Sequence, residues 1–145
     1  MLVESFFAAL KHRFHSDPAL VKSSGRLFLG FSGEPLRSGG PYVEATILGP
    51  HSDEDTFDKD IETYDVTFTA FSRSTVAEVP FRMLADLTRV FDDCVLGAAE
   101  FEDGGMFHRI PGGDAPRIAD GVYRASAQYM VKLQRKDLSP VVRGT

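Results

Sequence analysis

Residues 61–73 alternate between apolar and polar side chains with a period of two, which predicts a strand with one buried face. The predicted buried face consists of Tyr64, Val66, Phe68 and Ala70. After a polar break at residues 72–75 the period changes to 3.6, and one apolar stripe indicates an amphipathic helix. The stripe consists of Val76, Val79, Met83, Leu84, Leu87, Val90 and Phe91, and the positions expected to face away are Asp86, Arg89 and Asp92.

Two starting points are open for this helix. Thr75 to Glu78 fits a capping box, but Pro80 would then lie one turn inside the helix and kink it. A start near Glu78 instead places Pro80 in the first turn, where a proline is well tolerated. We favour the later start.

The same reading predicts an N-terminal helix and further strands. The helix covers residues 2–14, with its apolar stripe on Leu2, Val3, Phe6, Phe7, Leu10 and Phe14. Asp17 and Pro18 read as the cap and first turn of a short helical piece at residues 19–22. The remaining predicted strands are residues 26–31, 42–48, 98–102, 106–110 and 123–134. We therefore expect an α+β fold with two helices packed on one face of a mostly antiparallel sheet.

The composition is that of a globular protein. The chain has 145 residues, of which 43% are hydrophobic, and a formal net charge of −5. This length predicts a single domain, residues 1–136, followed by a patternless tail at residues 137–145. No basic stripe for nucleic acid is present, and no apolar run approaches the roughly 20 residues of a membrane span. We therefore expect no sequence-specific DNA binding, no membrane contact and no export signal.

An acidic loop interrupts the pattern between residues 50 and 60. Its carboxylates are Asp53, Glu54, Asp55, Asp58 and Asp60. Both registers in which these residues could form an EF-hand lack the glycine at the sixth position and the glutamate at the twelfth. Weak binding of a divalent ion, a docking loop, the lining of a passage for DNA and a simply solvated loop all stay open.

Catalytic chemistry has little support in the sequence. His12 and His15 share a face of the first helix, but no Cys or acidic partner follows at ligand spacing. His51 and His108 stand alone, and the glycine pairs match no phosphate-binding or dinucleotide-binding loop. The single cysteine, Cys94, reads as a small buried hydrophobe. We expect no catalytic residue, no metal and no cofactor.

An alternative hypothesis is a ligand-binding or enzymatic domain whose pocket lies between the helix of residues 78–93 and the sheet. The polar groups in such a pocket would be Tyr64, Tyr123 and Tyr129. Core tyrosines that form a single hydrogen bond at the rim are the more common reason for such positions.

Several segments together carry a resemblance to a known family. An amphipathic helix leads to Asp17-Pro18-Ala19-Leu20, a strand at residues 26–31, and then Gly39-Gly40-Pro41-Tyr42-Val43. The strand that ends in Phe71-Ser72-Arg73 precedes a helix with Leu84, Leu87 and Phe91, and Asp120-Gly121-Val122-Tyr123-Arg124-Ala125 opens the last strand. Over residues 5–134 the chain resembles the tail-terminator, or tail-completion, proteins of long-tailed phages and gene transfer agents.

The resemblance implies a structural virion protein with no catalytic activity. Such proteins form a ring of identical copies, commonly six, that caps the tail tube and ends its elongation. The partners implied are further copies of the chain, the major tail tube protein, and a head-completion or neck protein. DNA would pass through the ring without sequence-specific binding. The implied location is the head-proximal end of the virion tail, after assembly in the host cytoplasm.

Overall fold

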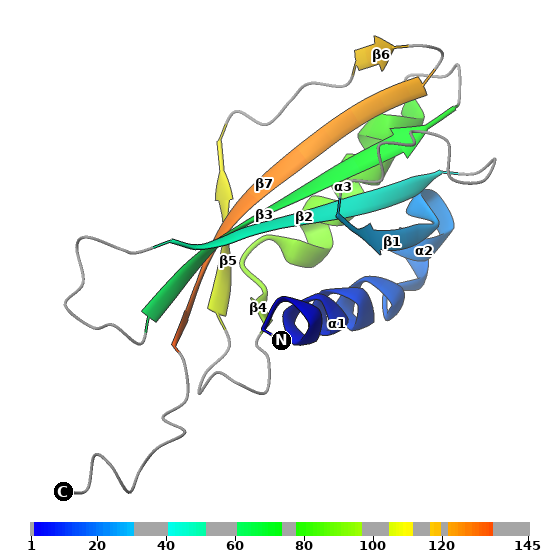
Figure 1. The fold of residues 1–145 in the computed structure, drawn as a ribbon. Coiled ribbons are helices and arrows are strands. Elements are labelled where there is room, and N and C mark those ends of the chain that lie inside the picture. Colours follow the sequence, from blue (N-terminus) through cyan, green and yellow to red (C-terminus); the bar gives the residue numbers. More distant parts are fainter. Residues whose placement is uncertain are drawn as a thin grey trace, which may run out of the picture.

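The computed structural model (Figure 1) describes residues 2–30, 41–51, 61–73, 78–96, 105–111, 117–119 and 122–134. These described residues form three helices and seven strands. The helices are α1 (Leu2–His15), α2 (Pro18–Ser24) and α3 (Glu78–Phe91). The strands are β1 (Arg26–Leu29), β2 (Tyr42–His51), β3 (Ile61–Ser72), β4 (Val95–Leu96), β5 (Gly105–Ile110), β6 (Arg117–Ala119) and β7 (Val122–Gln134).

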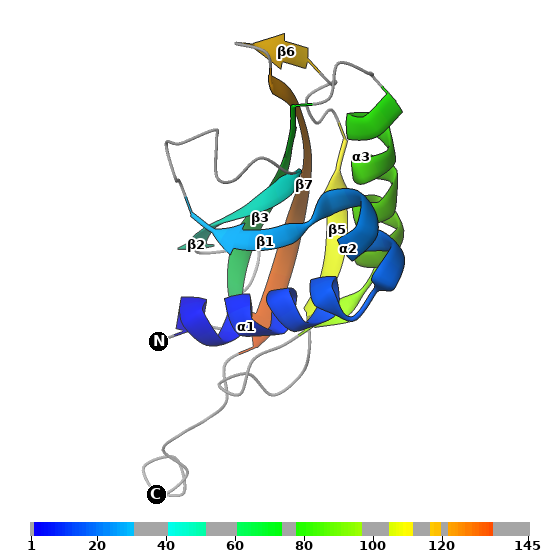
Figure 2. The same cartoon turned by 90° about the vertical axis from the view of Figure 1, so that its right-hand side faces the viewer.

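The strands form one mixed, curled sheet in the order β1-β2-β3-β7-β5-β4, and β6 pairs with the start of β7. All pairs are antiparallel except β1–β2, which is parallel. The helices lie on one side of the sheet (Figure 2), where α3 packs on β3 and β7 and α1 packs on β1. The predicted α+β class is confirmed. The finer prediction of two helices on one face of a mostly antiparallel sheet is not met exactly, because the short piece after Asp17 is a third helix; β1–β2 is the one parallel pair among the described strands.

The periodic patterns of the chain account for the longest elements. In β3, Tyr64, Val66, Phe68 and Ala70 are buried against the helices, as their alternation predicts. In α3, Met83, Leu87, Val90 and Phe91 are buried, and Val79 and Leu84 pack partly buried against them. The helix begins at Glu78 with a buried Pro80 in its first turn, so the later of the two predicted starts is confirmed.

Local capping chemistry sets the bounds of α2. The Asp17 side chain accepts a hydrogen bond from the backbone N–H of Leu20 at 3.0 Å, and Pro18 follows in the first turn. At the other end Gly25 takes a φ of 74°, and its N–H donates to the carbonyl of Val21. A Cβ atom at Gly25 would lie 2.1 Å from the carbonyl oxygen of Pro41, so this position requires glycine.

Several predicted strand boundaries change, and so does one predicted strand pairing. The strand of residues 42–48 continues to His51 through an irregularity after Leu48, where Gly49 takes a φ of 132°. β5 lies where the second half of a hairpin is predicted, but its described partners are β4 and β7. The first half of that hairpin, residues 98–102, lies outside the described residues, and so does the tail at residues 137–145.

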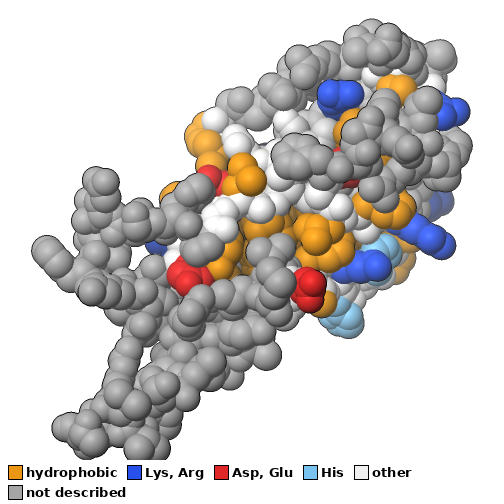
Figure 3. Space-filling model, in the orientation of Figure 1, with side chains coloured by type: hydrophobic (Ala, Val, Ile, Leu, Met, Phe, Trp, Pro, Cys, Tyr) orange, Lys and Arg blue, Asp and Glu red, His pale blue; other side chains and the backbone are white. Residues whose placement is uncertain are grey.

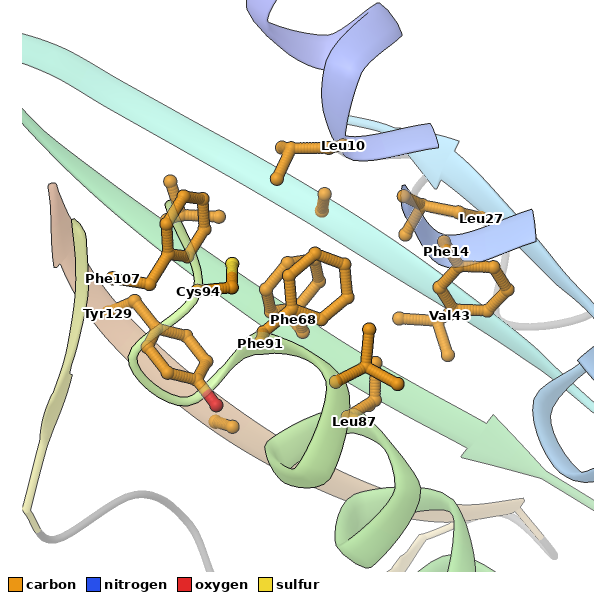
Figure 4. Close-up of a cluster of buried hydrophobic side chains, with 14 of the residues drawn as sticks. Leu10, Phe14, Leu27, Val43, Phe68, Leu87, Phe91, Cys94, Phe107 and Tyr129 are labelled. Atoms are coloured by element: carbon orange, nitrogen blue, oxygen red, sulfur yellow. The ribbon is translucent and has the colours of Figure 1, made fainter. Parts of the chain in front are cut away.

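The hydrophobic core lies between the sheet and the three helices (Figure 4). The ring of Phe68 on β3 stacks on Phe91 of α3 with the centroids 4.5 Å apart. Phe107 of β5 and Tyr129 of β7 extend this aromatic cluster, with centroids 5.7 Å apart. Leu10 and Phe14 add the face of α1, and both are fully buried. Each large side chain buried in this way contributes about 1.5–3 kcal/mol.

Candidate interaction surfaces

The candidate docking or lumen loop lies outside the described residues; its carboxylates are Asp53, Glu54, Asp55, Asp58 and Asp60. Its attachment points are nevertheless fixed, because β2 ends at His51 and β3 begins at Ile61. The other ends of these two strands meet where Tyr42 pairs with Phe71. His51 and Ile61 therefore lie at the end of the sheet opposite Tyr42 and Phe71 (Figure 1).

The histidines and the cysteine gather into no reactive cluster in the described residues. His12 and His15 are exposed on α1, and His108 is exposed on β5. Within the described part of the chain no three His, Cys, Asp or Glu side chains are arranged to hold a metal ion, and no helix there could span a membrane. Cys94 is buried as predicted, and burial raises the pKa of its thiol to about 11.

Core side chains fill the space between α3 and the sheet, where the alternative hypothesis expects a ligand pocket (Figure 4). Tyr64 and Tyr129 are both buried, and each hydroxyl donates a hydrogen bond of 2.6 Å to a carboxylate, Tyr64 to Glu62 and Tyr129 to Asp92. Burial, with the bond to Asp92, raises the pKa of Tyr129 far above its ordinary value. Tyr64 and Tyr129 are therefore core tyrosines, and each hydroxyl forms a hydrogen bond at the rim of the core.

The polar face of α3 holds the helices together, which corrects the prediction that it faces away from the molecule. The Arg89 guanidinium makes two hydrogen bonds of 2.9 Å to the two carboxylate oxygens of Asp17. On the same helix, Asp86 accepts a 2.6 Å hydrogen bond from the hydroxyl of Ser23 on α2. The third polar position, Asp92, accepts the hydrogen bond from Tyr129. All three therefore bind groups from other elements.

An open hollow of about 160 Å³ lies at this junction. It is lined by Arg13, Ser16, Asp17, Arg89 and Val90. The Arg13 guanidinium donates to the carbonyl of Val90 at 3.2 Å, and the hydrogen bonds from Arg89 lower the pKa of Asp17 to about 2. Since Arg89 binds Asp17 and Arg13 binds a backbone carbonyl, the hollow is a structural junction between α1, α2 and α3.

A second, smaller hydrophobic cluster lies on the face of the sheet opposite the helices. Tyr42 of β2 stacks on Phe71 of β3 with the centroids 4.9 Å apart, and Phe28 of β1 packs edge-on against Tyr42 at 5.9 Å. Val122 of β7 completes the cluster. Sequence reasoning missed it, although one signal was available: the predicted polar face of β2 begins with Tyr42, and the polar face of β3 continues to Phe71.

Arginines surround this cluster at the same end of the sheet. Strand pairing aligns Arg26, Tyr42, Phe71 and Arg124 across four neighbouring strands, and the Arg124 guanidinium lies 5.2 Å from the centroid of the Phe71 ring. Arg73 follows the last residue of β3. We call Arg26, Tyr42, Phe71, Arg73 and Arg124 the arginine–aromatic patch. Lys and Arg side chains are visible at the upper right of Figure 3, over the ends of β3 and β7.

The arginines of this patch differ from those on the helix side in having no acidic partner among the described residues. Arg89 pairs with Asp17, and Arg109 lies 3.5 Å from Asp92. In contrast, no carboxylate of the described residues pairs with Arg26, Arg73 or Arg124. Arg26 and Arg73 are exposed.

Exposed apolar side chains mark the two opposite edges of the sheet. Leu29, on the edge strand β1, is 39% exposed. At the other edge Val95 of β4 and Met106 of β5 are cross-strand neighbours and are 57% and 44% exposed. Unpaired edge strands and exposed apolar side chains both favour contact with another chain.

No protein-family model matches the chain, and no curated protein matches it in sequence. Its architecture, an α+β fold with three helices on one side of a curled sheet, does occur in solved structures. A chain from the virion of a native gene transfer agent particle superposes with a TM-score of 0.70 at 15% sequence identity. The match covers 92% of this chain and 97% of that chain. A second solved structure superposes with a TM-score of 0.65 at 12% identity, and that match covers 94% and 99% of the two chains. These likenesses establish a shared fold.

Proposed function

We propose that the chain is a structural protein of a phage-type virion or gene transfer agent particle. The observation that carries this proposal is the fold shared with a chain of a gene transfer agent virion, which extends over nearly the full length of both chains. The sequence over residues 5–134 also resembles the tail terminators of such particles. Both lines of evidence favour a protein that acts by assembly, and we assign it no catalytic role.

Within that class we propose the role of tail terminator. Copies of the chain, six in the proposed ring, cap the last ring of the tail tube, end its elongation and present a surface to a head-completion or neck protein. A closed ring requires two different complementary surfaces on each subunit. The opposite sheet edges, with Leu29 on one and Val95 and Met106 on the other, are suitable candidates.

The acidic segment with Asp53, Glu54, Asp55, Asp58 and Asp60 is assigned to docking in this proposal. DNA passes through the ring without sequence-specific binding, which agrees with a net charge of −5 that repels the phosphate backbone. The ring belongs to the head-proximal end of the tail and assembles in the host cytoplasm.

Deletion of the gene in the strain that carries it tests the role. We expect electron micrographs to show filled heads without tails, together with tubes longer than those of the wild type. Supplying the intact chain from a plasmid should restore particles of normal length. Normal particles in the deletion strain would refute a role in the virion, whereas heads that fail to fill would assign the chain to the capsid.

A further inference from the structure

We propose that the edge strand β1 of one copy pairs in parallel with the edge strand β4 of the next copy, so that the sheet continues from subunit to subunit. The inference rests on the proposed self-association, and it specifies the strands that meet, their direction and their register. The occupant of each sheet edge is thus a second copy of this chain.

The outer side of β1 presents backbone groups that no described strand pairs with. Gly30 donates its N–H to the carbonyl of Ala45 on β2 at 2.8 Å, so its backbone points inward. Successive residues of a strand direct their backbone groups to opposite sides. The N–H and C=O groups of Leu27 and Leu29 therefore point away from β2, and such groups can bind a further strand.

The outer side of β4 presents the same kind of groups. Phe107 of β5 donates its N–H to the carbonyl of Cys94 at 2.9 Å, so the backbone of Cys94 points toward β5. By the same alternation, the N–H and C=O of Val95 point away from β5. No described strand pairs with this side of β4.

The directions of the two edge strands agree with a repeating contact. β1 and β2 are parallel, and each of the next four pairs in the sheet order is antiparallel. Four reversals restore the direction of β1, so β4 runs the same way as β1. A rotation that carries the sheet of one copy onto that of the next therefore places β4 and β1 in parallel, and its repetition closes a ring.

The hydrogen-bonding groups select a register with Val95 opposite Phe28. In a parallel ladder, one residue bonds with both neighbours of the residue opposite it. The Val95 N–H then donates to the carbonyl of Leu27, and the Val95 carbonyl accepts from the N–H of Leu29. Both backbone groups of Val95 are thereby satisfied, and Leu29 lies opposite Leu96.

This register also matches the two faces of the sheet. Phe28 packs in the cluster opposite the helices, and Val95 shares that face because its neighbour Leu96 packs against the main core. Leu29 lies on the helix side with Leu27, which is buried in the core two residues before it. Each apolar side chain of β1 therefore meets an apolar side chain of β4 on the same face.

Charge complementarity favours the same register. Two positions before Phe28 and Val95 are Arg26 and Asp93, which come to lie beside each other across the contact. Both are exposed, and neither forms an ion pair with another described residue. Opposite charges side by side on neighbouring strands stabilise their pairing.

Lysine on each edge tests the contact, with self-association followed by sedimentation velocity. We expect L29K and V95K each to weaken association of the pure variant by at least about tenfold, because a lysine on an edge strand opposes strand addition. Each variant keeps one intact edge. An equimolar mixture should therefore form species of two chains and nothing larger, with β1 of V95K bound to β4 of L29K.

The matched control is F81K, which places the same charge on another exposed apolar residue. Phe81 lies on α3, is 56% exposed and belongs to neither edge strand. We expect F81K to associate like the wild type.

Charge reversal tests the register. R26E and D93K should each weaken association, because like charges then face each other across the contact. The chain that carries both changes should associate with itself as the wild type does, since Glu of one copy then meets Lys of the next.

Hydrogen exchange of the wild-type chain provides a measurement that needs no substitution. On passing from dilute to assembled protein, we expect slower exchange at the amides of Leu29 and Val95, which become hydrogen-bonded. Amides in the middle of α3 should exchange at the same rate in both.

Three outcomes would overturn the inference, and they distinguish it from the proposed function. If L29K and V95K both form rings, or if rings form without slower exchange at both edges, β1 and β4 do not join, and the ring-forming role stands. If pure L29K or pure V95K forms stable pairs, the contact joins like edges and not β1 to β4. A wild type that stays monomeric at every concentration overturns both the inference and the proposed ring.

Discussion

Replacement of Phe91 by alanine tests whether α3 contacts the sheet through the face assigned to it. Phe91 is fully buried, stacks on Phe68 at 4.5 Å and lies 5.9 Å from the ring of Phe107. Loss of such a side chain leaves a cavity and costs about 3–5 kcal/mol. A domain has a net stability of only about 5–15 kcal/mol, so the variant should lose a large part of it. In a domain of this size we expect Tm to fall by about 6–20 °C.

Phe81 provides the control because it is the same residue type on the same helix and is 56% exposed. Phe81→Ala should change the free energy of unfolding by no more than about 0.5 kcal/mol. Urea unfolding followed by circular dichroism measures both variants, with calorimetry for Tm. The assignment of the buried face is refuted if Phe91→Ala costs less than about 1 kcal/mol, a range typical of surface positions. It is equally refuted if Phe81→Ala costs as much as Phe91→Ala.

Three further predictions concern single positions. Arg89 lowers the pKa of Asp17 to about 2, so the stability that the Asp17 charge supplies is complete above about pH 4 and is lost as the pH falls through 2. Asp17→Asn should be less stable than the wild type at pH 7 and should lack this acid-induced loss of stability. Identical pH profiles of the two proteins would contradict the ion pair. Gly25→Ala should lower the free energy of unfolding, measured with urea, by more than about 1 kcal/mol, because alanine is strained at a φ of 74° and its Cβ would meet the Pro41 carbonyl. An unchanged free energy of unfolding would contradict this backbone geometry. Cys94 should react with a disulfide reagent at pH 8 only in urea, since the residue is 8% exposed and burial raises the pKa of its thiol to about 11. Rapid reaction of the native protein would show that the thiol is accessible.

The elements with strong periodicity could be predicted from sequence because one face of each is buried along its full length. β3 and α3 follow this rule, and Pro80 identifies the start of α3 because proline is tolerated only in the first turn of a helix. The N-cap of α2 could also be predicted from sequence, since Asp17 and Pro18 act on the backbone within one turn of the helix.

Sequence could not supply the contacts between distant elements. The pattern of β1 predicts a strand but contains no signal that β2 pairs with it in parallel. Asp86 and Arg89 occupy the polar face of α3, so the sequence pattern predicts that their side chains face solvent. Their partners Ser23 and Asp17 lie 63 and 72 positions away, and only the packing of α2 on α3 brings them together.

The arginine–aromatic patch escaped sequence analysis for the same reason. Tyr42, Phe71 and Arg124 come from three strands that are far apart in the chain, and each lies on a face that is mostly polar. They become a surface only when the strand register aligns them. The acidic segment, in contrast, is contiguous and was visible at once as a candidate for docking.

The central claim is that the chain acts by assembling into a closed ring of identical copies. Negative-stain electron microscopy of the purified protein at low ionic strength tests it most directly. We predict class averages of closed rings with rotational symmetry and a central opening, built from six copies. Fields that contain only particles of the size of a single 16.0 kDa chain, at every concentration, would contradict the account.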